Sequence, residues 1–139
     1  AVNLKEMAAL DVPIIALVIG EGGSGGALGV AVADRVLILE NAYYSVISPE
    51  GCAAILWKDR AFAPDASAAL KLDAHELLKL GVADQIIEEP TCGAHAEWNE
   101  SAERVKNSIV EVVHSLSHSQ DLISKRYEKF RRIGAVVES

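Results

Sequence analysis

Seven consecutive residues, Gly20 to Gly26, include five glycines in the order Gly-Glu-Gly-Gly-Ser-Gly-Gly. An apolar run at 12–19 comes directly before this stretch, and a second apolar run at 27–33 follows it. The pattern predicts a buried strand that turns into a helix through a loop with almost no Cβ atoms. A ligand oxygen that carries negative charge can approach the bare backbone N–H groups at such a junction.

The same glycines fit a second motif. The spacing Gly20-x-Gly22-x-x-Gly25 matches the G-x-G-x-x-G of dinucleotide-binding folds, and a strand-like run ends at Glu40, near the place of a ribose-binding carboxylate. Against this interpretation, the expected helix after the loop is short and another expected helix precedes the strand. A P-loop is excluded because no Lys-Ser/Thr pair follows the glycines. A plain packing turn would need fewer glycines, since each costs backbone entropy.

Hydrophobic periodicity predicts alternating helices and strands up to about residue 90 and helices after it. Strands are expected at 13–19, 35–39, 43–47 and 82–90. Helices are expected at 2–10, 24–33, 49–57, 63–70, 73–80, 97–117 and 120–133, with Asp73 as an N-cap and Gly81 as a helix stop. Strand 13–19 is apolar on both faces, so in a parallel sheet it needs a neighbouring strand on each side.

The charge distribution argues against binding to a nucleic-acid backbone. The formal net charge is −7, whereas duplex binding needs a concentrated basic face. One basic cluster, at 125–132, reads Lys-Arg-Tyr-Glu-Lys-Phe-Arg-Arg in a helical pattern. We interpret it as a solvated helix face, and the alternative is contact with an acidic partner or a CoA phosphate.

Cysteine and histidine spacing predicts no metal site. Cys52 and Cys92 lack a Cys-x-x-Cys spacing, so both are expected to be free thiols. His114 and His118 stand four residues apart on one expected helix, but no third ligand is near them in the sequence. No apolar run reaches membrane-spanning length, and no signal-peptide pattern is visible at the start, although a lost transit peptide stays open.

Two motifs together carry a family resemblance. Residues 18–28 contain the glycine loop, and residues 43–58 read Tyr-Tyr-Ser-Val-Ile-Ser-Pro-Glu-Gly-Cys-Ala-Ala-Ile-Leu-Trp-Lys. The likeness continues through 80–90, Gly93-Ala94-His95 and Lys125-Arg126-Tyr127. Over essentially its whole length, the chain resembles the carboxyltransferase α subunits of bacterial and plastid acetyl-CoA carboxylases.

The resemblance implies an α/β crotonase-like (ClpP/crotonase) spiral fold, present as a partial domain and followed by C-terminal helices. It begins in the middle of the family's catalytic domain. Residues 1–96 would therefore form the C-terminal part of that domain, and residues 97–139 a C-terminal helical extension. Upstream residues would supply some of the neighbours that strand 13–19 needs.

The resemblance also implies the site. The backbone N–H groups of Gly25 and Gly26 would form an oxyanion hole for the ureido oxygen of carboxybiotin. Gly22, Gly23 and Ser24 would form the rest of the loop on the biotin side.

Hydratases of the same fold carry a catalytic glutamate three residues after the oxyanion-hole glycine, where this chain has Leu28. Glu50 is the counterpart of a second hydratase glutamate, and we interpret it as a first-turn carboxylate that the helix dipole favours. The roles of Glu50 and His95 stay open.

In the family, the reaction moves a carboxyl group from carboxybiotin on its carrier protein to acetyl-CoA, giving malonyl-CoA for fatty acid biosynthesis. The implied partners are a β subunit in an α2β2 assembly, the biotin carboxyl carrier protein and the ATP-dependent biotin carboxylase. The β subunit would hold a zinc ion, and the place of action would be the bacterial cytoplasm or the plastid stroma. Alternatives are another biotin-dependent acyl-CoA carboxyltransferase, a crotonase-like acyl-CoA enzyme, or a non-catalytic module that binds the β subunit.

Overall fold

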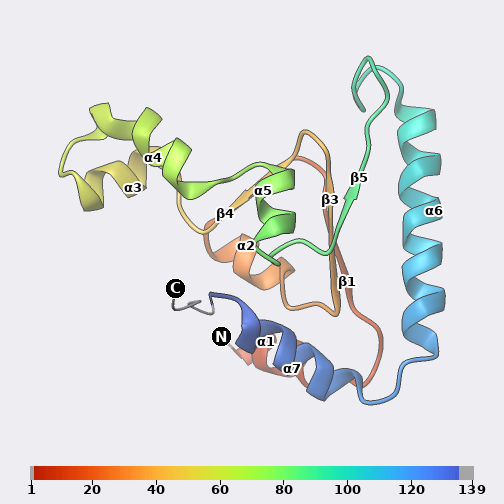
Figure 1. The fold of residues 1–139 in the computed structure, drawn as a ribbon. Helices are drawn as coiled ribbons and strands as arrows, with labels where there is room; N and C mark the ends of the chain where they lie inside the picture. Colours follow the sequence, from red (N-terminus) through yellow and green to blue (C-terminus); the bar gives the residue numbers. More distant parts are fainter. Residues whose placement is uncertain (1, 135–139) are drawn as a thin grey trace.

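A parallel sheet of three short strands forms the centre of the computed structural model, which describes residues 2–134 (Figure 1). The strands are β1 (Ile15–Val18), β3 (Arg35–Leu39) and β5 (Gln85–Ile87), in the order β1-β3-β5. Ile15 pairs with Arg35, and Leu37 pairs with Gln85. Leu37 and Ile38 of the central strand are fully buried, which explains why these strands are almost entirely apolar.

A second, two-stranded parallel sheet lies beside the glycine-rich segment. It consists of β2 (Glu21–Gly23) and β4 (Tyr43–Ser45), and it pairs Gly22 with Tyr44. The chain therefore passes from β1 through β2 before it enters helix α2 (Ser24–Val30).

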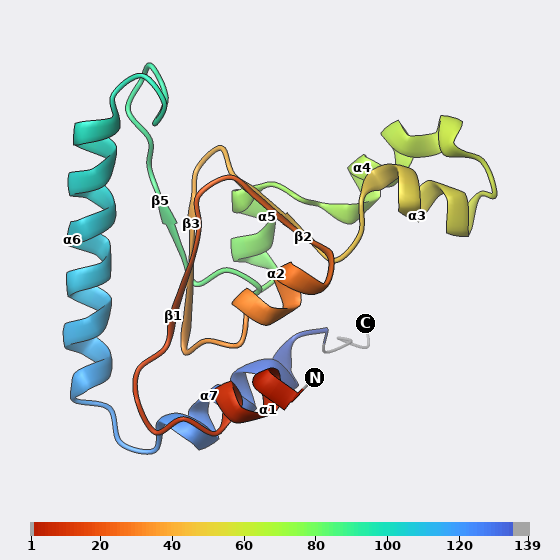
Figure 2. The ribbon, with the colours of Figure 1, turned by 180° about the vertical axis from the view of Figure 1, so that it is seen from behind.

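The other helices surround the two sheets. They are α1 (Val2–Ala8), α3 (Pro49–Leu56), the 3-10 turn η1 (Arg60–Phe62), α4 (Ala63–Leu70), α5 (Ala74–Lys79), α6 (Trp98–Ser117) and α7 (Leu122–Arg132). In both ribbon views the long helix α6 runs along one side of the main sheet, and α2 and α5 lie on the other side (Figures 1 and 2). Helices α1 and α7 lie side by side near the two ends of the chain, whereas α3, η1 and α4 form an arm that projects away from the sheet.

Side chains cap the N-termini of helices α3 and α5. Asp73 accepts a hydrogen bond from the Glu76 N–H at 3.0 Å, and Ser48 accepts one from the Gly51 N–H at 3.1 Å. Gly81 follows α5 with a φ of +71°, a value that glycine adopts without strain. The predicted cap and stop of this helix are confirmed.

The division of the chain at residue 96 stays a prediction. Helix α6 begins at Trp98, directly after the predicted boundary. Val112 and Leu116 of α6 and Leu122 of α7 belong to the same buried cluster as the strands. Within residues 2–134, no helix is long and apolar enough to cross a membrane.

Most predicted elements are present, but the strands are shorter than predicted. Strand 13–19 shrinks to β1 because the Ile14 N–H bonds to the Asp34 carboxylate at 2.7 Å and so leaves the ladder. Strand 82–90 shrinks to β5 because the Val82 and Ala83 N–H groups donate to the Leu77 carbonyl. The prediction missed β2 and η1. Among the described residues β1 pairs with β3 alone, so it forms an edge of the main sheet.

Arg126 is buried at the centre of a network that joins three parts of the chain. Its side chain is 2% exposed, and its Nε and Nη2 donate to the two carboxylate oxygens of Asp34 at 3.0 and 2.9 Å. The same guanidinium donates to four backbone carbonyls of the segment that leads from α1 into β1, those of Met7, Ala8, Leu10 and Val12. All of its N–H groups therefore have acceptors, as a buried charge requires.

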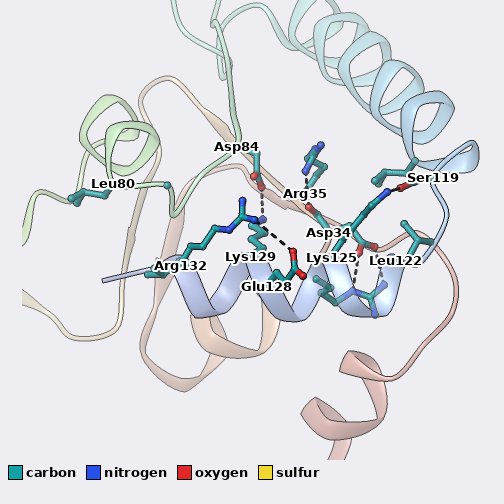
Figure 3. A pocket seen from close by; sticks show the side chains of 14 residues that line it. Asp34, Arg35, Leu80, Asp84, Ser119, Leu122, Lys125, Glu128, Lys129 and Arg132 are labelled. Atoms are coloured by element: carbon teal, nitrogen blue, oxygen red, sulfur yellow. Dashed lines mark hydrogen bonds and ion pairs between the residues drawn. The ribbon is translucent and has the colours of Figure 1, made fainter. Parts of the chain in front are cut away.

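A second ion pair, one helical turn further along α7, also joins a cation of this helix to an aspartate that precedes a strand. The Lys129 ammonium contacts the Asp84 carboxylate, and Figure 3 shows the two side chains pointing toward each other. Asp84 also accepts a hydrogen bond from the Val36 N–H at 2.6 Å. Asp34 and Asp84 directly precede β3 and β5, so α7 supplies a cation to the amino ends of two neighbouring strands.

These contacts correct the interpretation of the basic cluster 125–132 as a solvated helix face. Lys125, Arg131 and Arg132 are exposed, but Arg126 and Lys129 face inward. The reason is that the amino edge of the sheet carries two carboxylates whose charges need partners.

We predict that Arg126→Ala lowers the free energy of unfolding by about 3–5 kcal/mol, because the change leaves the Asp34 carboxylate buried without its counter-charge. Urea denaturation followed by circular dichroism measures the effect. Arg131→Ala is the matched control, since Arg131 is exposed on the same helix. Equal stability of the two variants would contradict a structural role for the buried pair.

Candidate functional site

The glycine-rich segment forms a sharp turn between β2 and α2. Ser24 begins α2 with a φ of +59°, in the left-handed region that residues other than glycine rarely adopt. Such a conformation costs about 1–3 kcal/mol and persists where the surrounding structure enforces it. Gly23, directly before it, is extended, with φ −138° and ψ 154°.

A hollow of about 360 Å³ opens beside this turn. Its lining comes from the end of β1, from β2 and from the start of α2, and consists of 17–23, Gly26, Ala27 and Tyr44. The structure therefore brings Gly22, Gly23 and Gly26 together at one hollow. Ser24 and Gly25 are exposed on the same turn but do not line the hollow.

Gly25 and Gly26 are exposed residues in the first turn of α2. The first N–H groups of a helix have no partner within the helix. In the part of the chain that the structure describes, neither group donates to a backbone acceptor outside α2. A Cβ at either glycine would meet nothing within 4 Å, so packing within residues 2–134 does not explain why these two positions are glycine.

Gly22 is glycine for a steric reason. A Cβ at this position would lie 2.7 Å from Cδ2 of Tyr44, whose ring stands over Gly22 in the two-stranded sheet. Tyr44 is buried, and its hydroxyl donates a hydrogen bond to the Ala27 carbonyl. Burial raises the pKa of Tyr44, so this hydroxyl stays protonated and keeps its role as a donor at neutral pH.

Few ionisable side chains reach the hollow. Glu21 and Tyr44 are the two that line it. Desolvation and the nearby Glu21 carboxylate raise the pKa of the neighbouring Tyr43. Leu28, one turn further along α2, is 54% exposed and has no ionisable group.

Ser24 is not placed to act as a nucleophile. The spacing Gly22-x-Ser24-x-Gly26 and the left-handed serine have the form of a nucleophile elbow. However, a nucleophilic serine needs a base within hydrogen-bond reach, and none of the hydrogen bonds that serine hydroxyls make in the described residues joins Ser24 to a histidine or a carboxylate. The turn therefore offers backbone donors and not a covalent nucleophile.

The dinucleotide interpretation does not fit the structure. In that fold the glycine loop leads from a strand directly into a long helix, whereas here β2 intervenes and α2 covers only Ser24–Val30. Glu40, the proposed ribose ligand, instead accepts a hydrogen bond from the Glu89 N–H at 3.1 Å. Glu89 in turn accepts from the N–H groups of Ala94 and Asn41, which hold its pKa below the usual value.

The remaining candidate residues do not line the hollow. Glu50 is exposed in the first turn of α3, as predicted for a carboxylate near a helix N-terminus. His95 is exposed in the connection between β5 and α6. The imidazole rings of His114 and His118 lie 4.8 Å apart on α6. Among the described residues, no group of three or more His, Cys, Asp and Glu side chains is placed to hold a metal ion.

Sequence comparison links the chain to curated proteins over nearly its full length. A family model described as acetyl co-enzyme A carboxylase carboxyltransferase-like matches residues 1–134. The chain is 52% identical over 140 residues to an acetyl-coenzyme A carboxylase carboxyl transferase subunit alpha of Nostoc punctiforme, covering 99% of this chain and 43% of that protein. It is 54% identical over 140 residues to the subunit of the same name from Staphylococcus aureus (strain bovine RF122), covering 99% of this chain and 45% of that protein.

Solved structures show the same fold. A transcarboxylase 12S core matches with a TM-score of 0.67 at 17% identity, over 86% of this chain and 21% of that one. A Pseudomonas malonate decarboxylase hetero-tetramer in complex with coenzyme A matches with a TM-score of 0.68 at 17% identity, over 94% and 51% of the two chains. An enoyl-CoA hydratase from Mycobacterium avium subsp. paratuberculosis matches with a TM-score of 0.55 at 20% identity, over 92% and 52%. At these identities the likeness concerns the fold alone, and the predicted crotonase-like fold is confirmed.

We predict that Gly22→Ala destabilises the protein by about 1–3 kcal/mol, because the new methyl group overlaps the Tyr44 ring. Gly20→Ala is the matched control, since a Cβ there meets nothing within 4 Å. Thermal unfolding of both variants measures the difference. If Gly22→Ala unfolds at the temperature of Gly20→Ala, the packing of Tyr44 against Gly22 is wrong.

Proposed function

The chain belongs to the acetyl-CoA carboxylase carboxyltransferase family, and from this premise we propose that it is part of an α subunit that transfers a carboxyl group from carboxybiotin to acetyl-CoA. The product would be malonyl-CoA, for fatty acid biosynthesis. The chain spans 43–45% of the length of the two curated relatives described above. The activity of the whole subunit is therefore proposed for the complete protein.

One observation carries the assignment of the site. Gly25 and Gly26 are exposed, their N–H groups have no backbone acceptor outside α2 among the described residues, and an added Cβ at either position would meet nothing within 4 Å. Two neighbouring donors without a backbone acceptor outside the helix suit an oxygen whose negative charge grows during the reaction. We assign these two N–H groups as the oxyanion hole and Gly22, Gly23 and Ser24 as its flank on the biotin side.

Bound carboxybiotin would supply the activated carboxyl group. The N–H groups of Gly25 and Gly26 would hold its ureido oxygen, and each fixed donor of this kind is worth on the order of 3 kcal/mol in the transition state. The chain has Leu28 and not a glutamate at the hydratase position. Its contribution is therefore charge stabilisation and orientation of two large substrates, and not proton transfer from that position.

The family also suggests the partners. A β subunit in an α2β2 assembly would bind the acyl-CoA enolate and carry the zinc ion. The biotin carboxyl carrier protein would deliver carboxybiotin, which the ATP-dependent biotin carboxylase would produce. In a bacterium these components would act in the cytoplasm, and in a plant in the plastid stroma.

The test is a reverse carboxyl-transfer assay with purified β subunit and an α subunit that contains this segment. Malonyl-CoA-dependent carboxylation of biocytin is expected. A stable complex without turnover would contradict the proposal and would favour the alternative in which the segment only binds the β subunit.

We predict that Gly25→Val lowers the turnover of this complex by about 100-fold or more, on the scale of losing one oxyanion-hole donor. The branched side chain would occupy the space that the ureido oxygen needs. Size-exclusion chromatography is expected to show unchanged assembly, because a Cβ at this position meets nothing within 4 Å.

Gly25→Ala is the graded control. It keeps the N–H and adds one methyl group, so its loss of turnover is expected to be smaller than that of Gly25→Val. Normal turnover in Gly25→Val would rule out the oxyanion-hole assignment.

A further inference from the structure

The turn that presents the two N–H groups has few contacts of its own. Ser24, Gly25 and Gly26 are exposed, and the two glycines have no Cβ through which neighbouring side chains could hold them. Glycine-rich backbone has more conformations available than other backbone. The direction of the two N–H groups therefore depends on how the chain is fixed just before and just after them.

Tyr44 contacts the chain on both sides of this turn. On the near side, its ring stands over Gly22, where an added Cβ would lie only 2.7 Å from Cδ2. On the far side, its hydroxyl donates to the Ala27 carbonyl, one residue after Gly26. Tyr44 is 8% exposed and Ala27 is 3% exposed, so both contacts are sheltered from water.

We propose that Tyr44 is a positioning residue for the oxyanion hole, because one rigid side chain fixes the distance between β2 and α2 and thereby the direction of the Gly25 and Gly26 N–H groups. This inference rests on the proposed function. We assign Tyr44 no contact with the substrate oxygen. It acts through the backbone between Gly22 and Ala27, which it contacts at both ends.

The hydroxyl and the ring have separable roles. Removing the hydroxyl leaves the ring over Gly22, and the Ala27 carbonyl still accepts the Ala31 N–H at 3.0 Å within the helix end. Tyr44→Phe is therefore expected to fold, but it removes the hydrogen bond that joins β4 to the first half of α2. An oxyanion hole depends on donors that are already oriented before the reaction, so the loss is expected in turnover more than in substrate binding.

The experiment compares Tyr44→Phe with the matched control Tyr127→Phe in the full α–β complex. Tyr127 is 66% exposed on α7 and lies in neither the hollow nor the sheets. We expect Tyr44→Phe to lower kcat by about tenfold with a change in the KM for malonyl-CoA of less than about threefold, as for an interaction made mainly in the transition state. Tyr127→Phe is expected to match the unsubstituted complex.

A second readout does not depend on activity. In glycine-labelled α subunit, nuclear magnetic resonance order parameters report the backbone motion of single glycines on the picosecond to nanosecond timescale. Tyr44→Phe is expected to lower the order parameters of Gly25 and Gly26 and to leave those of Gly81 and Gly93 unchanged.

Three results would overturn the positioning role. They are an unchanged kcat, a loss of activity that only follows the fraction of unfolded protein, and unchanged order parameters at Gly25 and Gly26. If the unsubstituted complex has no carboxyl-transfer activity but the two glycines gain mobility in Tyr44→Phe, the proposed function fails, whereas the structural part of the inference, that Tyr44 fixes the backbone of the glycine turn, is supported.

Discussion

The buried ion pair between Arg126 and Asp34 is the interaction on which the arrangement of the chain depends. It joins helix α7, the start of β3 and the segment that leads from α1 into β1, which are distant in the sequence. A buried charge is tolerated only when its partners satisfy it fully, so the six hydrogen bonds of the guanidinium fix all three segments together. The ion pair between Lys129 and Asp84 likewise joins α7 to the start of β5.

The amino ends and the carboxyl ends of the parallel strands have different roles. At the amino ends of β3 and β5, ion pairs fix Asp34 and Asp84. The carboxyl end of β1 leads through β2 into the glycine turn, where Gly25 and Gly26 are exposed. The two ion pairs thus lie at the amino ends of β3 and β5, whereas the glycine turn follows the carboxyl end of β1, in agreement with the general position of ligand sites outside the carboxyl ends of parallel strands.

Local patterns in the sequence predicted much of the fold, since apolar runs, the Asp73 cap and the Gly81 stop depend on neighbouring residues only. The glycine turn was also found in this way. The β2–β4 pairing and the role of Tyr44 were missed, because a glycine-rich strand has almost no apolar signal and Gly22 meets Tyr44 only in three dimensions. The inward position of Arg126 was missed as well. A signal for it exists, because Val-Ala-Asp precedes both β3, at 32–34, and β5, at 82–84. A carboxylate that recurs at the start of two largely buried strands favours a cation beside each one.

In the proposed site, backbone N–H groups and not side chains hold the charged oxygen. A crystal structure of the complete α–β complex with bound biocytin would locate that oxygen. We expect the ureido oxygen to lie about 2.7–3.1 Å from the nitrogen atoms of Gly25 and Gly26, the distance range of oxyanion-hole donors. A ureido oxygen that is bound by a side chain, or that lies away from the glycine turn, would rule out the proposed site.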